Sequence, residues 1–333
     1  MLHHVDELLL PGGFLGVDLF FVLSGFLITR ILLVEQLETG GIRLVRFYAR
    51  RALRLLPALV GLLAAVLVFS AIVLGPYLLR QNARAAGIVL LYAMNWARAF
   101  SLHPKGILMH TWSLSIEEQF YLLWPLGLVV LLKFVSSRRG LVAAALALAG
   151  ASTVDRACLL LSGASLERVY NGLDAHASGL LLGCAVGVAW LVGPREASGR
   201  ILREEFLRVA GLLSLAGLVL LYLVAQWSLR ATHLWQLTAA ELLSAVLVVA
   251  AFGSRGGILG TLLGSRPLTY TGRISYGLYL WHFPIFFVLS AAGFASPAVF
   301  LLGMPLSFGI ASASFFVLER PFLRLKARLG SRP

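Results

Sequence analysis

The chain has 333 residues and a formal net charge of +13, with 28 Lys and Arg residues against 15 Asp and Glu. Hydrophobic residues make up 59% of it and charged residues 13%, and its mean hydropathy is +0.88. Because soluble globular domains carry about 25% charged residues, this composition excludes an ordinary soluble domain. Most of the cations are arginines in short segments between apolar runs. This pattern indicates membrane topology and contact with anionic head groups, not nucleic-acid binding.

Ten apolar segments follow a short stub at residues 1–10. They span residues 13–34, 57–79, 86–100, 114–135, 140–162, 171–193, 206–226, 233–253, 275–294 and 297–318. About 20 apolar residues are long enough to cross a bilayer as a helix. We therefore predict an all-α bundle of about ten transmembrane helices over residues 1–325, followed by a basic cytoplasmic tail at residues 326–333.

The first of these helices is predicted to be truncated. Residues 1–10 supply at most about 15 Å of helix, which is half a crossing. An outward-going helix is needed before residues 13–34 if that segment runs inward. The stub is also too short, and with Asp6 and Glu7 too acidic, to be a cleavable signal peptide.

The most basic loop, Arg43 to Arg54, is assigned to the cytoplasm by the positive-inside rule. Residues 86–100 contain Asn95 and Arg98, which suit a short or re-entrant piece that lines a cavity. If that piece does not cross, the remaining basic segments fall on the same side as the first loop. These are residues 136–139, 195–203, 255–273 and the C-terminus.

The segment at residues 14–29, FLGVDLFFVLSGFLIT, carries Asp18 and Ser24 inside an apolar helix. A carboxylate in hydrocarbon is costly unless it faces the bundle interior or a wet cavity. The segment therefore predicts a site inside the bundle that Asp18 and Ser24 line.

A second set of polar side chains opens another apolar helix. Ser113 and Glu117 are four residues apart and share a helix face, which Tyr121 continues. Ser115 and Glu118 fit a capping box, with Ser115 as the N-cap residue and Glu118 at the third helical position. Glu118 is therefore interpreted as structural, and Glu117 as a candidate to line the site.

Several histidines admit two interpretations. His3 and His4, at the end of the stub, are candidates for a general base or an acyl carrier, or are surface or capping residues. His282, two positions before a proline, is expected to bond a neighbouring helix or a freed carbonyl, or to take part in catalysis. His176 lies beside Asp174, and a mutually satisfied structural pair is favoured. Cys158 and Cys184 lack ligand partners, so neither a metal site nor a disulfide framework is expected.

Arg51 and Arg54 are three residues apart and so lie on one helical face. Guanidinium groups bind phosphates bidentately, so this face suits a phosphorylated donor such as a coenzyme A thioester. The alternative is that both arginines only mark the cytoplasmic side.

Five motifs in order resemble those of the bacterial acyltransferase family 3 membrane proteins, which acylate sugars, antibiotics and envelope polymers. The motifs are PGGFLGVD with FFVLSGF at residues 11–26, RFYARRALRLLP at 46–57, TWSLSIEEQFY at 111–121, ISYGLYLWHFP at 274–284 and ERP at 319–321. The resemblance implies a roughly ten-helix bundle with acyl-CoA as the cytoplasmic donor.

The resemblance also implies site residues. His4, with His3 as the fallback, matches the histidine of the first helix, whose partner arginine eleven positions earlier is absent here. Glu117 matches the motif carboxylate, and Arg51 and Arg54 the arginine pair. The family often has arginine where His176 stands. The expected substrate- or donor-binding residues are Arg51, Arg54, Ser24, Trp112, Ser113, Ser115, Tyr121, Tyr279 and His282.

The expected catalytic residues are His4, Asp18 and Glu117. His4, oriented by one of the carboxylates, would take the proton of an acceptor hydroxyl or relay the acyl group. The expected activity moves an acetyl or short acyl group from acyl-CoA to a carbohydrate, cell-envelope glycolipid or related metabolite, without a permanently bound cofactor. The expected location is the bacterial cytoplasmic membrane. The alternative is a glycan transporter or flippase, against which the sequence shows no internal repeat.

Overall fold

The computed structural model describes residues 10–103, 106–192, 200–253 and 257–328. Over these ranges the secondary structure is entirely helical, so the all-α class is confirmed. Eight helical stretches are long and apolar enough to cross a membrane, and Ser178–Leu191 is a shorter apolar helix. About ten crossings therefore stays a prediction. His3 and His4 lie outside the described residues.

The helices are these. The first half has η1 (Gly13–Leu15), α2 (Gly16–Thr39), α3 (Leu44–Phe69), η2 (Ser70–Leu74), α4 (Gly75–Leu90), α5 (Met94–Ala99), η3 (Met109–Thr111), α6 (Trp112–Phe134) and α7 (Arg138–Leu161). The second half has α8 (Leu166–Asn171), α9 (Leu173–His176), α10 (Ser178–Val192), α11 (Arg200–Val224), η4 (Thr232–Gln236), α12 (Leu237–Gly253), α13 (Gly257–Leu263), α14 (Arg266–Ala291), α15 (Ser296–Ser314), η5 (Phe315–Glu319) and α16 (Arg320–Arg328).

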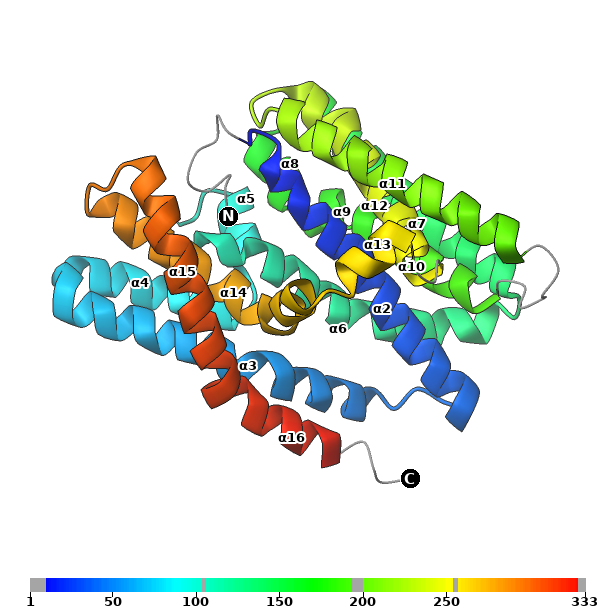
Figure 1. The fold of residues 1–333 in the computed structure, drawn as a ribbon, viewed down its shortest axis with the longest axis horizontal. Coiled ribbons are helices and arrows are strands. Elements are labelled where there is room, and N and C mark those ends of the chain that lie inside the picture. Colours follow the sequence, from blue (N-terminus) through cyan, green and yellow to red (C-terminus); the bar gives the residue numbers. More distant parts are fainter. Residues whose placement is uncertain (1–9, 104–105, 193–199, 254–256, 329–333) are drawn as a thin grey trace.

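Helix α2 runs through the middle of the molecule and packs against α6, α10 and α12 (Figure 1). Its contact with α10 is backbone to backbone: a Cβ on Gly25 would lie 1.8 Å from the Leu180 carbonyl oxygen. A Cβ on Gly183 would lie 2.0 Å from the Val22 carbonyl oxygen. Glycines at such positions let membrane helices approach closely, so these residues fix the α2–α10 pair.

The segment after α3 turns back on itself. Its direction reverses at Gly75, whose φ of 83° lies in the left-handed region that glycine adopts without strain. Helix α4 then returns beside α3 (Figure 1). Residues 86–100, which we predicted to be short or re-entrant, form the end of α4 and the six-residue α5.

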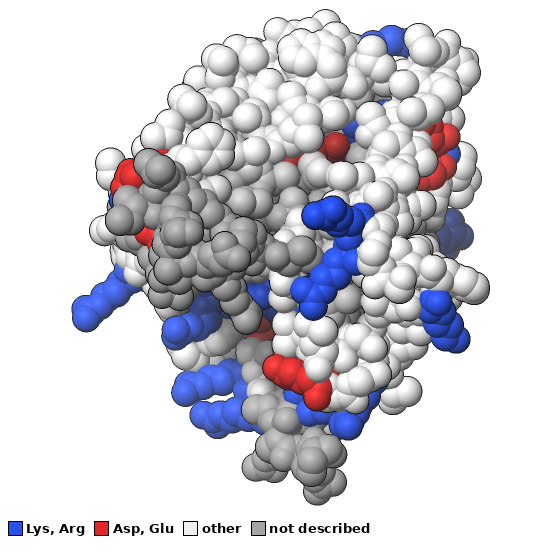
Figure 2. Space-filling model, turned by 90° about the vertical axis from the view of Figure 1, so that its right-hand side faces the viewer, with Lys and Arg blue, Asp and Glu red and all other residues white. Residues whose placement is uncertain are grey.

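The C-terminal ends of α2, α6 and α10 meet at one end of the bundle. They surround a cavity of about 170 Å³ together with the start of α7, where Arg138 donates a 3.3 Å hydrogen bond to the Leu191 carbonyl. Figure 2 shows Lys and Arg side chains spread over the lower half of the face at this end, with few Asp and Glu between them. The ends predicted to share the cytoplasmic side therefore lie together.

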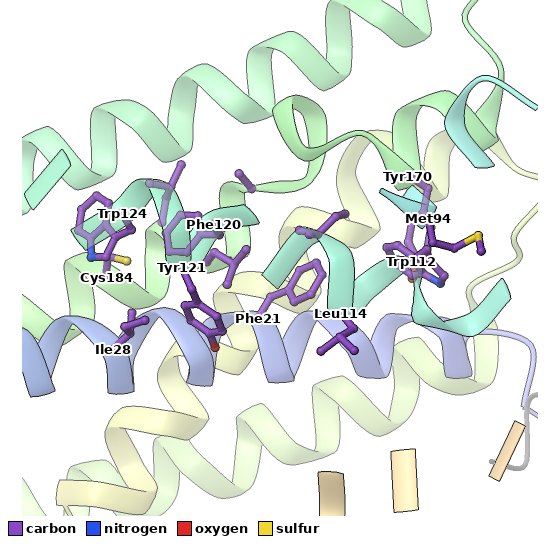
Figure 3. Close-up of a cluster of buried hydrophobic side chains, with 14 of the residues drawn as sticks. Phe21, Ile28, Met94, Trp112, Leu114, Phe120, Tyr121, Trp124, Tyr170 and Cys184 are labelled. Atoms are coloured by element: carbon purple, nitrogen blue, oxygen red, sulfur yellow. The ribbon is translucent and has the colours of Figure 1, made fainter. Parts of the chain in front are cut away.

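One part of the apolar core lies between α2 and α6 (Figure 3). Its large side chains include Phe21 from α2 and Phe120, Tyr121 and Trp124 from α6. Since lipid is as apolar as these side chains, close packing, not transfer from water, drives such association. The core holds α6 against α2 in the register that brings their polar side chains together.

Candidate active site

Asp18 of α2 and His176 of α9 form a fully buried pair. Asp18 Oδ1 lies 2.8 Å from His176 Nε2, and both side chains are 0% exposed. His176 Nδ1 lies 2.6 Å from the Tyr170 carbonyl oxygen. Because a carbonyl only accepts, Nδ1 must carry a hydrogen. One further proton then lies between Nε2 and Oδ1, so the pair is either an imidazolium with a carboxylate or a neutral imidazole with a carboxylic acid.

Aromatic rings enclose His176. The Trp112 ring stacks on it with the centroids 5.9 Å apart, and the Tyr170 and Phe21 rings lie 4.6 and 5.3 Å away. The short helix α9 ends at His176, immediately before α10 begins, and this break sets the imidazole against α2. Trp112, an expected binding residue, therefore forms one wall of the Asp18–His176 pair.

The structure corrects the expected pairing of Asp174 with His176. Asp174 accepts two hydrogen bonds from Arg168, of 2.9 and 2.5 Å, and one of 2.9 Å from the Ala175 N–H. Burial alone would raise the pKa of Asp174, but these hydrogen bonds outweigh it and hold that pKa below its usual value. The two side chains are only two positions apart on a helix, so they do not face each other.

A second polar group joins α2 to α6. Ser24 Oγ donates a short hydrogen bond to Glu117 Oε1, which the Tyr121 hydroxyl also approaches at 3.4 Å. Figure 3 shows the Tyr121 hydroxyl pointing toward α2. Ser24 lies six residues beyond Asp18, which is about 9 Å along a helix axis. Asp18 is buried, Ser24 and Glu117 are partly buried, and the three residues lie on two successive parts of one interface.

The polar face of α6 continues toward α14. The Tyr279 hydroxyl donates to the His110 carbonyl oxygen at 2.5 Å and lies 2.9 Å from Ser113 Oγ. Since a phenol has one hydrogen, Ser113 is the donor in the second contact. Ser113 and Tyr279 thus extend the hydroxyl-rich side of the interface on which Glu117 lies.

The capping box predicted for Ser115 and Glu118 is wrong. Helix α6 begins four residues earlier than predicted, at Trp112, because the 3₁₀ turn η3 leads directly into it. Ser115 lies inside the helix, donates to the Thr111 carbonyl at 3.1 Å and accepts from the Met94 N–H at 3.2 Å. It therefore ties α5 to α6.

Glu118 instead forms an ion pair with Arg51. Arg51 Nη2 lies 2.6 Å from Glu118 Oε1, Nε donates to both carboxylate oxygens, and the guanidinium lies 3.1 Å from the centre of the Tyr121 ring. Arg54 is exposed on the same helix and lies within electrostatic range of Glu118 and Glu319. The two arginines thus differ, since Arg51 is held by the bundle and Arg54 faces outward.

Pro284 frees a carbonyl in α14. With no N–H at Pro284, the Leu280 carbonyl lacks its usual partner in the helix, and His110 Nε2 donates to it at 3.1 Å. His282 does not take this carbonyl, because its Nδ1 bonds the Leu278 and Tyr279 carbonyls at 3.1 and 2.7 Å. The expectation of a freed carbonyl was right, but His110 is the residue that satisfies it.

We did not predict the buried pair of Arg156 on α7 and Glu241 on α12. Arg156 Nη1 lies 3.2 Å from Glu241 Oε1, to which Ser178 also donates at 2.6 Å. Ionisable residues within two apolar segments are a signal that could have found them. Glu241, Asp18 and His176 offer ligand atoms within 4.8 Å of one another. His176 Nε2, Asp18 Oδ1 and Glu241 Oε1 bond protein partners, whereas Asp18 Oδ2 has none among the described residues.

Known proteins resemble this chain along nearly all of its length. The sequence profile of the acyltransferase domain of family 3 matches residues 2–316. The peptidoglycan O-acetyltransferase OatA of Listeria monocytogenes is 32% identical over 335 residues, covering 96% of this chain and 53% of that protein. The O-acetyltransferase OatA of Staphylococcus aureus is 32% identical over 342 residues, covering 96% and 54%.

The chain thus spans about half the length of these relatives. No solved structure matches it. The all-helical bundle, the polar side chains between α2 and α6, and the match over residues 2–316 agree with one another. The chain belongs to the acyltransferase family 3 of membrane proteins.

Proposed function

We propose that the protein moves an acetyl or short acyl group from acyl-CoA to a hydroxyl of a cell-envelope carbohydrate, with peptidoglycan as the first acceptor to test. The observation that carries this proposal is the family match over residues 2–316. The acceptor is proposed from the similarity to the peptidoglycan O-acetyltransferase of Listeria monocytogenes. The proposed location is the bacterial cytoplasmic membrane, with the arginine-rich end inside.

In the proposed reaction the acceptor oxygen attacks the thioester carbonyl carbon. A C–O bond forms, the C–S bond breaks, and the hydroxyl proton passes through a base to the departing coenzyme A sulfur. We assign the base to His4 from the family resemblance. The ionisable groups at the α2–α6 interface, Asp18 and Glu117, would orient that base and stabilise its charged form, since a preorganised low-dielectric site strengthens such interactions.

The donor phosphates are assigned to the Arg51–Arg54 face. Arg54 is exposed and available to an anion. Arg51 is 20% exposed and bonds Glu118 through Nε and Nη2, which leaves Nη1 for a phosphate. Glu118 would thereby fix the direction of the guanidinium before the donor binds, and preorganisation of this kind favours affinity.

The test uses the full-length protein in lipid nanodiscs with radiolabelled acetyl-CoA and soluble peptidoglycan fragments. Acetyl ester formation is expected, with a loss of about 100-fold for His4→Ala and for Glu117→Gln, in the range typical of general acid–base groups. Glu35→Gln, in the last turns of α2, is the matched control and should keep the wild-type rate. An intact thioester with every acceptor would reject the proposal and favour the transporter.

A further inference from the structure

The Asp18–His176 pair has a feature that neither residue type alone would provide. His176 donates its Nδ1–H to the Tyr170 carbonyl oxygen. Its hydrogen bond to Asp18 therefore requires a second proton between Nε2 and Oδ1. If that proton leaves, a bare nitrogen faces a carboxylate. Two acceptors cannot bond, so the link between α9 and α2 is lost.

The second carboxylate oxygen of Asp18 is not used in the contact with His176. Oδ2 is buried and has no hydrogen-bond partner among the described residues. An unmade hydrogen bond of a buried carboxylate is costly, and such groups are found where a ligand or a catalytic side chain completes them. His176 therefore sets the direction in which Oδ2 is presented to the interior.

Several titratable and charged side chains surround the Asp18–His176 pair. Its titratable or charged neighbours are Arg98 on α5, Arg156 on α7, Tyr170 on α8, Tyr222 on α11, His233 on η4 and Glu241 on α12. Helices α6 and α10 place the uncharged side chains of Trp112 and Ser178 beside it. Arg156 neutralises Glu241 at 3.2 Å, so Asp18 is the carboxylate that bonds the imidazole.

We propose that His176 is a positioning residue that holds Asp18 through a shared proton, so that acyl transfer depends on a hydrogen-bond donor at the position of its Nε2. The inference rests on the proposed function, since the rate of acyl transfer is one of its two readouts. The other readout is the protonation of the imidazole, which needs no activity.

The rate experiment compares side chains that imitate different parts of the imidazole. His176→Gln places an amide donor near the position of Nε2, so it keeps a bond to Asp18 that no proton loss can break. His176→Asn imitates only the Nδ1 side, so it keeps the Tyr170 contact and loses Asp18. His176→Arg offers a permanent charge in case the amide is too weak a donor.

In the full-length protein we expect the rate of acyl transfer by His176→Gln or His176→Arg to stay close to that of the wild type, and that of His176→Asn to be at least tenfold lower. His233→Gln, a buried histidine whose Nε2 bonds the Trp227 carbonyl at 2.8 Å, is the matched control and should keep the wild-type rate. A His176→Asn rate equal to that of the wild type, or Gln and Arg variants as slow as His176→Asn, would overturn the proposal.

Nitrogen-15 NMR of histidine-labelled protein gives the independent readout, with the His176 signals identified by their absence in His176→Gln. Nδ1 should carry a hydrogen, and Nε2 should show the chemical shift of a nitrogen that shares a proton with Asp18. A bare Nδ1 with a protonated Nε2 would refute the inference. If no acceptor is acetylated, the proposed function fails, and the NMR result alone still decides the protonation of the pair.

Discussion

Two buried pairs of ionisable residues, Asp18–His176 and Arg156–Glu241, each join different helices. Arg156 and Glu241 are 1% and 2% exposed, and Arg156 also donates to Thr238 Oγ1 at 2.6 Å and to Ser178 Oγ at 3.1 Å. Removing one partner of such a pair leaves the other charge buried and uncompensated, which costs more than the pair contributes.

Glu241→Gln should therefore lower the free energy of unfolding by about 3–5 kcal/mol, measured by thermal or denaturant unfolding in detergent. Replacing both residues, Arg156→Met with Glu241→Leu, should recover most of this loss because no lone charge remains. The exposed pair Arg208–Glu205 is the control, and Glu205→Gln should cost less than about 1 kcal/mol. A double variant as unstable as Glu241→Gln would contradict this account.

Asp174 gives a prediction for the acid side. Hydrogen bonds from Arg168 and the Ala175 N–H hold its pKa below the usual value against the effect of burial. A lowered carboxyl pKa stabilises the fold above the pKa of the unfolded chain, about 3.9, and this contribution disappears as pH falls through the folded pKa. The unfolding temperature of Asp174→Asn should lie below that of the wild type at pH 6, and the two should converge near pH 3. An equal difference at both pH values would show that the carboxylate charge is irrelevant.

At the scale of elements, close helix packing depends on glycine. Gly183 on α10 and Gly25 on α2 each lie where a Cβ would overlap a carbonyl oxygen of the other helix. Gly127 on α6 and Gly150 on α7 have no atom of this kind within 4 Å. The same change of one methyl group is thus expected to have opposite effects at the two kinds of position.

Gly183→Ala or Gly25→Ala should prevent or severely weaken folding, because backbone cannot move aside as a flexible side chain can. Gly127→Ala and Gly150→Ala should be neutral or stabilising by up to about 1 kcal/mol, since alanine is the better helix former. The yield of monodisperse protein and its unfolding temperature measure both. Equal tolerance of alanine at all four positions would mean that α2 and α10 do not touch as described.

The sequence predicted which helical positions are polar, but not which of them meet. Asp18 and Glu117 were recognised as candidates because a carboxylate in an apolar membrane helix is costly unless it faces the bundle interior. Helical spacing orders residues within one helix, so it predicted the Glu117–Tyr121 stripe correctly. It could not reveal that His176 contacts Asp18, 158 positions away. Nor could it reveal that Glu118 forms an ion pair with Arg51 and does not cap a helix. Those partners depend on how the helices pack.

At the scale of the whole molecule, the basic ends of the helices define an orientation. The C-terminal ends of α2, α6 and α10 lie together, and α7 runs from that end to the opposite one. The positive-inside rule predicts that the arginine-rich end faces the cytoplasm.

Single cysteines test this orientation in a background with Cys158→Ser and Cys184→Ala. Glu38→Cys, after the last buried turn of α2, and Ser136→Cys, between α6 and α7, should react with a membrane-impermeant maleimide only in inside-out vesicles. Ser162→Cys, at the far end of α7, should react only from the other side. All three positions are exposed. Labelling of all three from one side would reject the arrangement.

The backbone contact between α2 and α10 limits how a reactant can enter. A glycine of each helix lies against a carbonyl oxygen of the other, so the two helices cannot slide or separate without losing this contact. Asp18 and Ser24, both on α2, therefore keep fixed positions. An opening that admits a reactant must come from movement of another helix packed against α2, such as α6.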